Sequence, residues 1–201
     1  MGRRRRPPPE PDQQKCGADR EPGARQLYLD ADGVLADFDA AAEQVLGERP
    51  SEYQRRHGVS AFWAAVEKSP DFFARAPLMP DALVLFEAVR HLDPIILTGL
   101  PRGDWAAPQK ARWAREHFPG TQIITCMAVD KPRYCGGGDV LVDDQPRNER
   151  PWQNAGGVFI LHKSAEETLR ALASYFPDLR PARSGHGQRG ERSEDRIVPA
   201  R

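Results

Sequence analysis

Cysteine is scarce in this chain, and apolar runs of membrane-spanning length are absent. The three cysteines, Cys16, Cys126 and Cys135, are odd in number, and none of them forms a CxxC pair. A disulfide framework is therefore not expected, and a reducing cytoplasmic location fits the sequence. No apolar run approaches the roughly 20 residues that cross a bilayer, and no apolar segment follows the N-terminal arginines. We therefore expect neither a membrane span nor a secretory signal.

The chain also lacks net charge, because its 29 basic and 29 acidic side chains cancel. The two ends are nevertheless basic. Residues 1–25 carry seven basic and four acidic side chains, and residues 180–201 carry six basic and three acidic ones. The segment between them is acidic, which argues against stable nucleic-acid binding by the body of the protein. An acidic body would also repel an anionic ligand unless a bound cation intervened.

With 201 residues, the chain can form one domain with a sizeable core. Residues 1–25 are rich in Arg, Pro and Gly and lack periodic apolar positions, so we predict a disordered arm there. The Arg3–Arg6 run could touch nucleic acid or a membrane surface, but such runs are more often simply solvated. Residues 180–201 have a similar composition and are predicted to be a tail. The remaining residues, 26–179, form the predicted globular domain.

That domain alternates apolar strand patterns with helical ones. Strands are expected at 27–29, 94–98, 122–125, 139–143 and 157–161, with helices at 80–91, 106–118 and from 164 onward. This alternation predicts the α/β class, with a parallel, Rossmann-like sheet flanked by helices. Residues 38–79 contain no convincing strand and are broken by Gly and Pro, so they are expected to form a small helical insertion. In the helix at 80–91, the expected buried stripe is Leu83, Phe86, Val89 and Leu92. In the helix at 106–118, it is Ala107, Ala111, Ala114 and Phe118.

The segment 27–35 is the most informative in the chain. An apolar strand ends there in two carboxylates, Asp30 and Asp32, and Gly33 lets the backbone turn away. Acids at the carboxyl end of a buried strand lie where open α/β sheets bind ligands. A surface turn is the plainer interpretation, since Asp and Gly are turn residues. An EF-hand loop is excluded, because its twelfth position, Ala41, is not Glu and its sixth is not Gly.

Three further polar positions follow predicted strands in the same way. Thr98 and Gly99 end the second strand, Lys131 follows the third, and the acidic pair Asp143-Asp144 ends the fourth. Taken alone, Thr98 would be ascribed to β-propensity and Lys131 to a solvated loop. Their order along the chain, after the paired acids of the first strand, is what makes them candidate site residues.

With these four strand ends, the chain resembles the haloacid dehalogenase-like (HAD) phosphatase superfamily. Its motifs are a DxDG strand end, a strand-end Ser or Thr, a Lys and a strand-end acidic pair, and all four occur within residues 26–176. The resemblance implies that Asp30 is a nucleophile forming an aspartyl-phosphate and that Asp32 is the general acid and base. Family members with other chemistry lack an acid at the second position, so Asp32 favours a phosphatase or phosphomutase.

The resemblance also implies how the phosphate and a cation are held. Thr98 and Gly99 would bind the phosphoryl group, and Lys131 would pair with it. Asp30, the backbone carbonyl of Asp32, and the pair Asp143 and Asp144 would bind Mg²⁺, which prefers hard oxygen ligands. Asp143 is the preferred direct ligand and Asp144 the alternative that holds a metal-bound water; the sequence does not separate the two roles.

Within the superfamily, the chain is most similar to the 5′(3′)-deoxyribonucleotidase group. The matching segments are Asp32–Phe38, Phe72-Phe73 followed by Ala76–Pro80, Lys110–His117 and Leu141–Asp144. The resemblance implies hydrolysis of small phosphate esters, nucleoside or deoxynucleoside 5′-monophosphates above all. One departure is Thr98-Gly99-Leu100-Pro101, where the group has a Ser-Pro type sequence.

In HAD enzymes, the insertion at 38–79 lies over the active site as a cap. The predicted pocket residues are Phe38, Phe62, Trp63, Phe72 and Phe73. About half of these aromatics are expected to form the core of the cap, while one or two would stack on a flat group such as a base. The alternatives are a phosphatase for another small ester, such as a sugar phosphate, and a catalytically silent binding protein with the same fold. The sequence does not reveal the oligomeric state.

Overall fold

A computed structural model describes residues 24–179. The predicted arm at 1–25, except for its last two residues, and the predicted tail at 180–201 lie outside this range. The strands are β1 (Leu27–Leu29), β2 (Ile95–Gly99), β3 (Ile123–Cys126), β4 (Val140–Asp143) and β5 (Val158–Leu161). The α-helices are α1 (Phe38–Leu46), α2 (Pro50–His57), α3 (Val59–Lys68), α4 (Ala82–Val89), α5 (Ala106–His117), α6 (Glu149–Asn154) and α7 (Ala165–Leu172). The short 3-10 helices are η1 (Phe73–Arg75), η2 (Arg90–Leu92), η3 (Ala128–Tyr134) and η4 (Pro146–Asn148).

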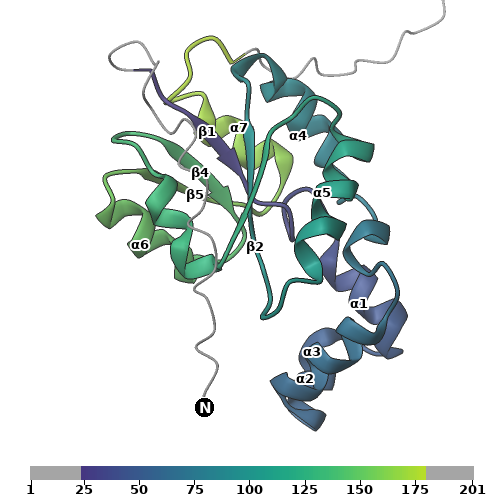
Figure 1. Ribbon diagram of the computed structural model, residues 1–201. Helices are drawn as coiled ribbons and strands as arrows, with labels where there is room; N and C mark the ends of the chain where they lie inside the picture. Colours follow the sequence, from purple (N-terminus) through teal and green to yellow (C-terminus); the bar gives the residue numbers. More distant parts are fainter. Residues whose placement is uncertain (1–23, 180–201) are drawn as a thin grey trace, which may run out of the picture.

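The five strands form one parallel sheet in the order β3-β2-β1-β4-β5, with helices on both faces (Figure 1). This arrangement confirms the predicted α/β class and the helical insertion after the first strand. Since β1 is central, with β2 on one side and β4 on the other, the chain reverses its direction of travel across the sheet at this strand. Ligand sites of open α/β folds form at the carboxyl ends of the strands at such a point.

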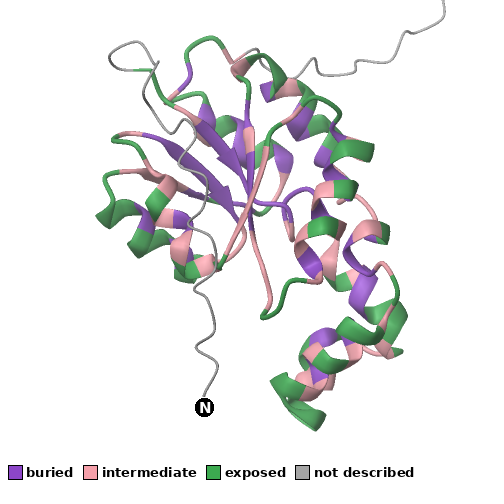
Figure 2. Cartoon of the chain, viewed as in Figure 1, coloured by how far each residue is buried: buried purple, intermediate pink, exposed green. Residues whose placement is uncertain are grey.

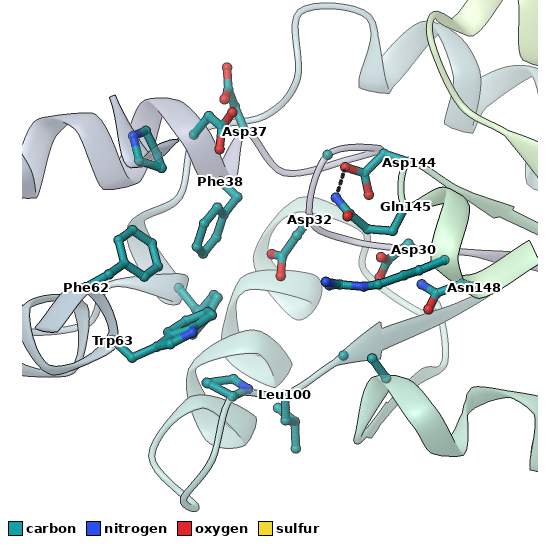
Figure 3. Close-up of a pocket in the computed structure, with 18 of the residues that line it drawn as sticks. Asp30, Asp32, Asp37, Phe38, Phe62, Trp63, Leu100, Asp144, Gln145 and Asn148 are labelled. Atoms are coloured by element: carbon teal, nitrogen blue, oxygen red, sulfur yellow. Dashed lines mark hydrogen bonds between the residues drawn. The ribbon is translucent and has the colours of Figure 1, made fainter. Parts of the chain in front are cut away.

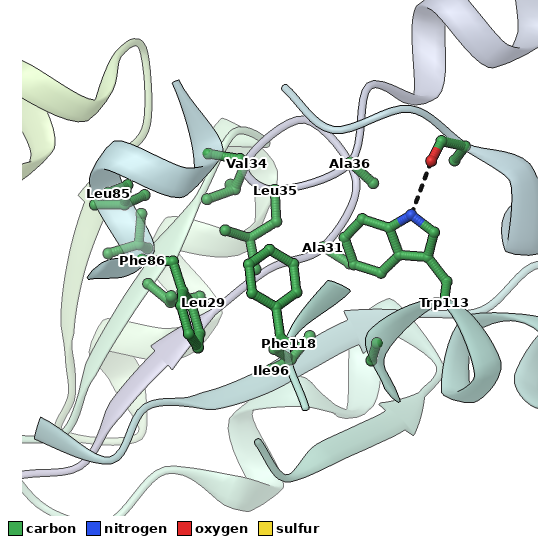
Figure 4. Close-up of a cluster of buried hydrophobic side chains, with 14 of the residues drawn as sticks. Leu29, Ala31, Val34, Leu35, Ala36, Leu85, Phe86, Ile96, Trp113 and Phe118 are labelled. Carbon is green, nitrogen blue, oxygen red and sulfur yellow. Dashed lines mark hydrogen bonds between the residues drawn. The ribbon is translucent and has the colours of Figure 1, made fainter. Parts of the chain in front are cut away.

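The central strand is buried on both faces, as alternating side-chain directions require. Leu27 and Leu29 enter a large apolar core, which is formed against α4, α5 and α7 (Figure 4). Tyr28 points to the other face, where a smaller cluster forms with Leu97, Leu141 and Trp152. In Figure 2, β1 and β4 are buried along their length, whereas β3 and part of β5 are of intermediate burial. The polar residues at the ends of the central strands are therefore attached to the most deeply buried part of the sheet.

The insertion consists of α1, α2, α3 and η1. Capping residues and proline mark several of its helix ends. The Asp37 carboxylate accepts a hydrogen bond from the Ala40 amide and caps α1, and Gly47 ends that helix at φ 72°. Pro50 occupies the first turn of α2, where its missing N–H has no cost. In Figure 1, α2 and α3 lie at the lower right of the molecule, away from the sheet.

Two predicted helix faces were only partly right: Phe86 and Val89 of the first and Ala114 and Phe118 of the second are buried as predicted, but other members are not. Leu83 is 52% exposed, and α4 buries Ala82, Leu85, Phe86 and Val89. On α5, Ala107 and Ala111 are half-buried, whereas Lys110 and Trp113 are buried. Trp113 sets which face of α5 is buried, because its indole N–H donates to the Ala76 carbonyl at 2.8 Å and its ring enters the large core (Figure 4). The structure also contains α6 and the 3-10 turn η3, which the sequence did not predict.

None of the helices within residues 24–179 combines the length and apolar character that crossing a bilayer requires.

Candidate active site

The ends of the three central strands bring the predicted site residues to one edge of the sheet. Leu29 pairs with Ile96 of β2 and with Val142 of β4, so the next residues on all three strands lie near one another. The Asp30 amide continues the ladder by donating to the Val142 carbonyl at 2.9 Å. Asp30 and Asp143 therefore leave neighbouring strands at the same level.

Lys131 lies between two of these carboxylates. Its Nζ is 2.9 Å from Asp30 Oδ2 and 2.6 Å from Asp143 Oδ2, and the three side chains are only 2%, 8% and 0% exposed. Burial alone would lower the pKa of Lys131, but the two carboxylates together raise it, so the lysine stays charged. One ammonium between two carboxylates leaves a formal charge of −1, which a bound cation would offset.

Hydrogen-bond donors engage both carboxylate oxygens of Asp143. Its Oδ2 also accepts a hydrogen bond from Asn148 Nδ2 at 2.8 Å, and its Oδ1 accepts one from the Gln145 amide at 2.8 Å. Burial and the neighbouring charge of Asp30 raise the pKa of Asp143, while Lys131 opposes them. Asp143 is fully buried and is not among the residues that line the pocket. Asn148, which lies five residues after Asp143, was not predicted from the sequence.

Asp144, in contrast, lines the pocket. Its Oδ2 accepts from Gln145 Nε2 at 2.6 Å, and its carboxylate lies against Gly33. A Cβ at Gly33 would overlap that carboxylate, and φ there is +77°, so two requirements select glycine. Burial, followed by the charge of Asp30, raises the pKa of Asp144 to about 7. The structure thus crowds carboxylates that repel one another.

Oxygens of Asp30, Asp143 and Asp144 lie within 4.8 Å of one another. An all-oxygen donor set of buried, mutually repelling carboxylates fits a hard divalent cation such as Mg²⁺. The residues that the sequence suggested as metal ligands are therefore brought together, with the side chain of Asp32 as the exception.

The Asp32 side chain points to a different partner, Lys110. The lysine Nζ is 2.5 Å from Asp32 Oδ2 and donates to Thr98 Oγ1 at 2.8 Å. Burial raises the pKa of Asp32, Lys110 opposes this rise, and Asp30 adds to it. Sequence reasoning missed Lys110 because a helix lysine is usually solvated. A signal was available, since Ala106, Lys110 and Trp113 recur at helical spacing on one face.

A cavity of about 720 Å³ opens between the strand ends and the cap (Figure 3). The predicted residues that line it are Asp30, Asp32, Gly99, Lys131, Asp144, Phe38, Phe62, Trp63 and Phe73. Of the other predicted residues, Thr98 and Asp143 lie behind its wall, and Phe72 belongs to the large apolar core. The cavity thus has carboxylates at its base and aromatic rings on its cap side.

Phe38 is the centre of the aromatic wall. Its ring centroid lies 5.9 Å from Trp63 and 5.5 Å from Phe72, and the rings of Phe62 and Phe73 are 6.2 and 6.1 Å away. Phe38 and Trp63 are half-buried, whereas the other three rings are buried. These two side chains therefore retain surface that a flat ligand could cover.

Comparison with known proteins identifies relatives of this chain. Residues 25–171 match the family model described as 5′ nucleotidase, deoxy (Pyrimidine), cytosolic type C protein. A Vibrio phage KVP40 protein, provisionally named 5′(3′)-deoxyribonucleotidase, is 24% identical over 123 residues, which are 61% of this chain and 67% of the phage protein.

Two solved structures are also similar. A hydrolase from Streptococcus pneumoniae TIGR4 has a TM-score of 0.47 at 16% identity, and the match covers 75% of this chain and 98% of that one. A dehalogenase has a TM-score of 0.42 at 14% identity, with 68% of this chain and 84% of that one covered.

Proposed function

Because this chain belongs to the 5′-nucleotidase, deoxy (pyrimidine), cytosolic type C family of hydrolases, we propose that it is a Mg²⁺-dependent phosphomonoester hydrolase. Its proposed substrates are nucleoside or deoxynucleoside 5′-monophosphates. The proposal is supported above all by the environment of Asp30. This carboxylate lines a cavity, contacts Lys131, and lies within 4.8 Å of two further acids. A carboxylate can attack a phosphate only where cations offset their mutual repulsion.

In the first step, an Asp30 oxygen attacks phosphorus while the ester bond to the nucleoside oxygen breaks. Asp32 donates its proton to that leaving oxygen, which departs as a neutral alcohol. Lys131 offsets the repulsion between the Asp30 carboxylate and the negatively charged phosphoryl oxygens. In the second step, Asp32 takes a proton from water, the water oxygen attacks phosphorus, and the bond to Asp30 breaks. Inorganic phosphate leaves, and Asp30 and Asp32 return to their starting states.

Asp30, Asp144 and the Asp32 carbonyl are the residues that would hold Mg²⁺ in this proposal. When bound, the ion would neutralise part of the phosphate charge and polarise the phosphoryl group. Asp144 is preferred over Asp143 as the direct carboxylate ligand, which reverses the preference from sequence. Both oxygens of Asp143 already accept hydrogen bonds and its side chain is enclosed, whereas Asp144 faces the cavity and keeps one oxygen uncommitted.

The cap side of the cavity supports a nucleotide over a sugar phosphate. A cavity of about 720 Å³ has room for a base beyond the phosphate, because ligand pockets range over roughly 300–1,000 Å³. The exposed surfaces of Phe38 and Trp63 can stack on a base, whereas a sugar would place most of its hydroxyls against apolar ring faces.

Phosphate release tests the proposal directly. Purified protein with Mg²⁺ is given nucleoside and deoxynucleoside monophosphates, sugar phosphates and p-nitrophenyl phosphate, and Asp30→Asn protein serves as the blank. Preferred hydrolysis of nucleotides is expected. Preference for a sugar phosphate would overturn the substrate class but keep the chemistry. Release no faster than the Asp30→Asn blank from every compound would favour a silent binding protein.

A further inference from the structure

Lys110 is a buried cation that the proposed mechanism does not yet use. Its side chain is 3% exposed and belongs to α5, while its partner Asp32 follows β1, 78 positions away in the sequence. Lys110 is not among the residues that line the cavity, so it acts on that cavity only through its neighbours. A buried lysine is rarely the most stable choice, because an apolar side chain of similar size avoids the cost of desolvating the charge.

Each contact of Lys110 is to a residue with a proposed role. Its Nζ donates to Asp32 Oδ2 and to Thr98 Oγ1, and it lies 4.5 Å from the centre of the Phe73 ring. The neighbouring Gln109 holds the backbone of the same residue, since its side-chain oxygen accepts from the Phe73 amide at 3.0 Å. The first turns of α5 therefore connect an acid, a hydroxyl and the aromatic wall of the cavity.

We infer that Lys110 is a positioning residue that orients the proposed general acid Asp32 and fixes the direction of the Thr98 hydroxyl. This inference rests on the proposed phosphatase function. One Asp32 oxygen is engaged by Lys110, which leaves the other to carry the transferred proton. The Thr98 oxygen accepts from Lys110, so its single proton is directed away from the lysine, and Thr98 itself lies behind the cavity wall.

The orientations of Asp32 and of the Thr98 hydroxyl would affect good and poor leaving groups differently. A nucleoside oxygen is a poor leaving group and needs the Asp32 proton, whereas p-nitrophenolate leaves readily without one. Loss of the Thr98 orientation would slow both substrates alike. Loss of the Asp32 orientation would slow the nucleotide selectively, so the ratio of the two kcat/KM values isolates the effect on the acid.

The test uses Lys110→Met, which keeps the length of the side chain and removes its charge. We expect kcat/KM for the best nucleotide to fall about 100-fold more than kcat/KM for p-nitrophenyl phosphate, a typical contribution of general acid catalysis. A second measurement introduces Lys110→Met into the Asp32→Asn protein, where the ratio should not change further, because the residue through which Lys110 acts is already disabled.

Two outcomes would overturn the inference. The first is an equal loss on both substrates in Lys110→Met, which would mean that Lys110 does not act through Asp32. The second is a ratio that still changes in the Asp32→Asn background. If Lys110→Met does not fold, Lys110→Gln, which is uncharged and shorter than Lys, replaces it in both measurements, and an unchanged ratio is again the overturning result. A wild-type protein that releases no phosphate would instead refute the proposed function, and the positioning role with it.

Discussion

At the base of the cavity, Lys131 reaches two buried carboxylates at 2.9 and 2.6 Å, whereas on the cap side Phe38 meets its aromatic neighbours at centroid distances of 5.5 to 6.2 Å. The base is built from strand ends of one sheet and the cap from short helices inserted into the chain. Directional, charged contacts need fixed geometry, which a parallel sheet supplies. Apolar contacts tolerate small shifts, which suits a wall that selects the substrate.

The largest expected effect comes from the base of the cavity. Asp30→Asn should lower kcat for the best substrate by at least about 10⁴-fold, as loss of a nucleophile does in other enzymes. The fold should remain, since Asn fills the same space; circular dichroism and thermal unfolding check this. Residual activity near the wild-type level would refute the nucleophile assignment.

Asp139→Asn is a matched control for that experiment. Asp139 is also a buried carboxylate, 1% exposed, but it accepts hydrogen bonds from the Gln26 and Gly136 amides and does not line the cavity. Its replacement should lower the melting temperature while leaving kcat almost unchanged.

Removal of divalent cations should have the next largest effect. A chelator is expected to abolish phosphate release and Mg²⁺ to restore it. Mg²⁺ should also raise the melting temperature, because it relieves the repulsion among Asp30, Asp143 and Asp144; saturation at 100 times Kd would stabilise the fold by about 2.7 kcal/mol.

Asp144→Asn should weaken both effects of Mg²⁺. Asp39→Asn, at an acid that lines the cavity on the cap side, should weaken neither. Full activity in the presence of chelator, with no thermal shift by Mg²⁺, would contradict the metal role.

A smaller and more selective effect is expected from the cap. Phe38→Leu should raise KM for nucleotides about tenfold, because stacking on a base is worth roughly 1–3 kcal/mol. Its kcat/KM for p-nitrophenyl phosphate should change little. Phe72→Leu removes a neighbouring ring that does not line the cavity, so it should lower stability by roughly 0.5–3 kcal/mol without selective loss of nucleotides. Equal effects of the two substitutions on KM would refute base stacking at Phe38.

The smallest effect is expected at His162, which does not line the cavity. A change there separates the pH dependence of stability from that of activity. Burial lowers the pKa of His162 from 6.5, with Asp81 opposing, and its Nδ1 lies 2.9 Å from Thr168 Oγ1. The folded state therefore binds the proton less readily than the unfolded state. His162 contributes stability above its ordinary pKa, and this contribution is lost as pH falls below that value. Replacing His162 with Gln should flatten the unfolding free energy against pH below 6.5; an unchanged slope would contradict this.

Much of the site could be predicted because it follows local rules. Asp30 follows β1, and Thr98 and Asp143 lie at the ends of β2 and β4, whose apolar runs are legible in the sequence; parallel strands align their carboxyl ends. Lys110 and Asn148 were not assigned a role in this way. Each becomes relevant only through a partner on another element, and a polar residue on a helix is ordinarily solvated.

The sequence alone determined the α/β class, the order of the strand-end residues and the presence of a helical insertion, since apolar periodicity and turn residues act over a few positions. Only the tertiary structure decided that α5 turns Lys110 inward, that Asp143 is enclosed while Asp144 faces the cavity, and that Phe38 lies at the centre of the aromatic wall. These outcomes depend on how distant segments pack, and a rotation of one residue position on a helix moves a side chain by about 100°. The pattern of a single segment does not fix that rotation; the shape of its neighbours does.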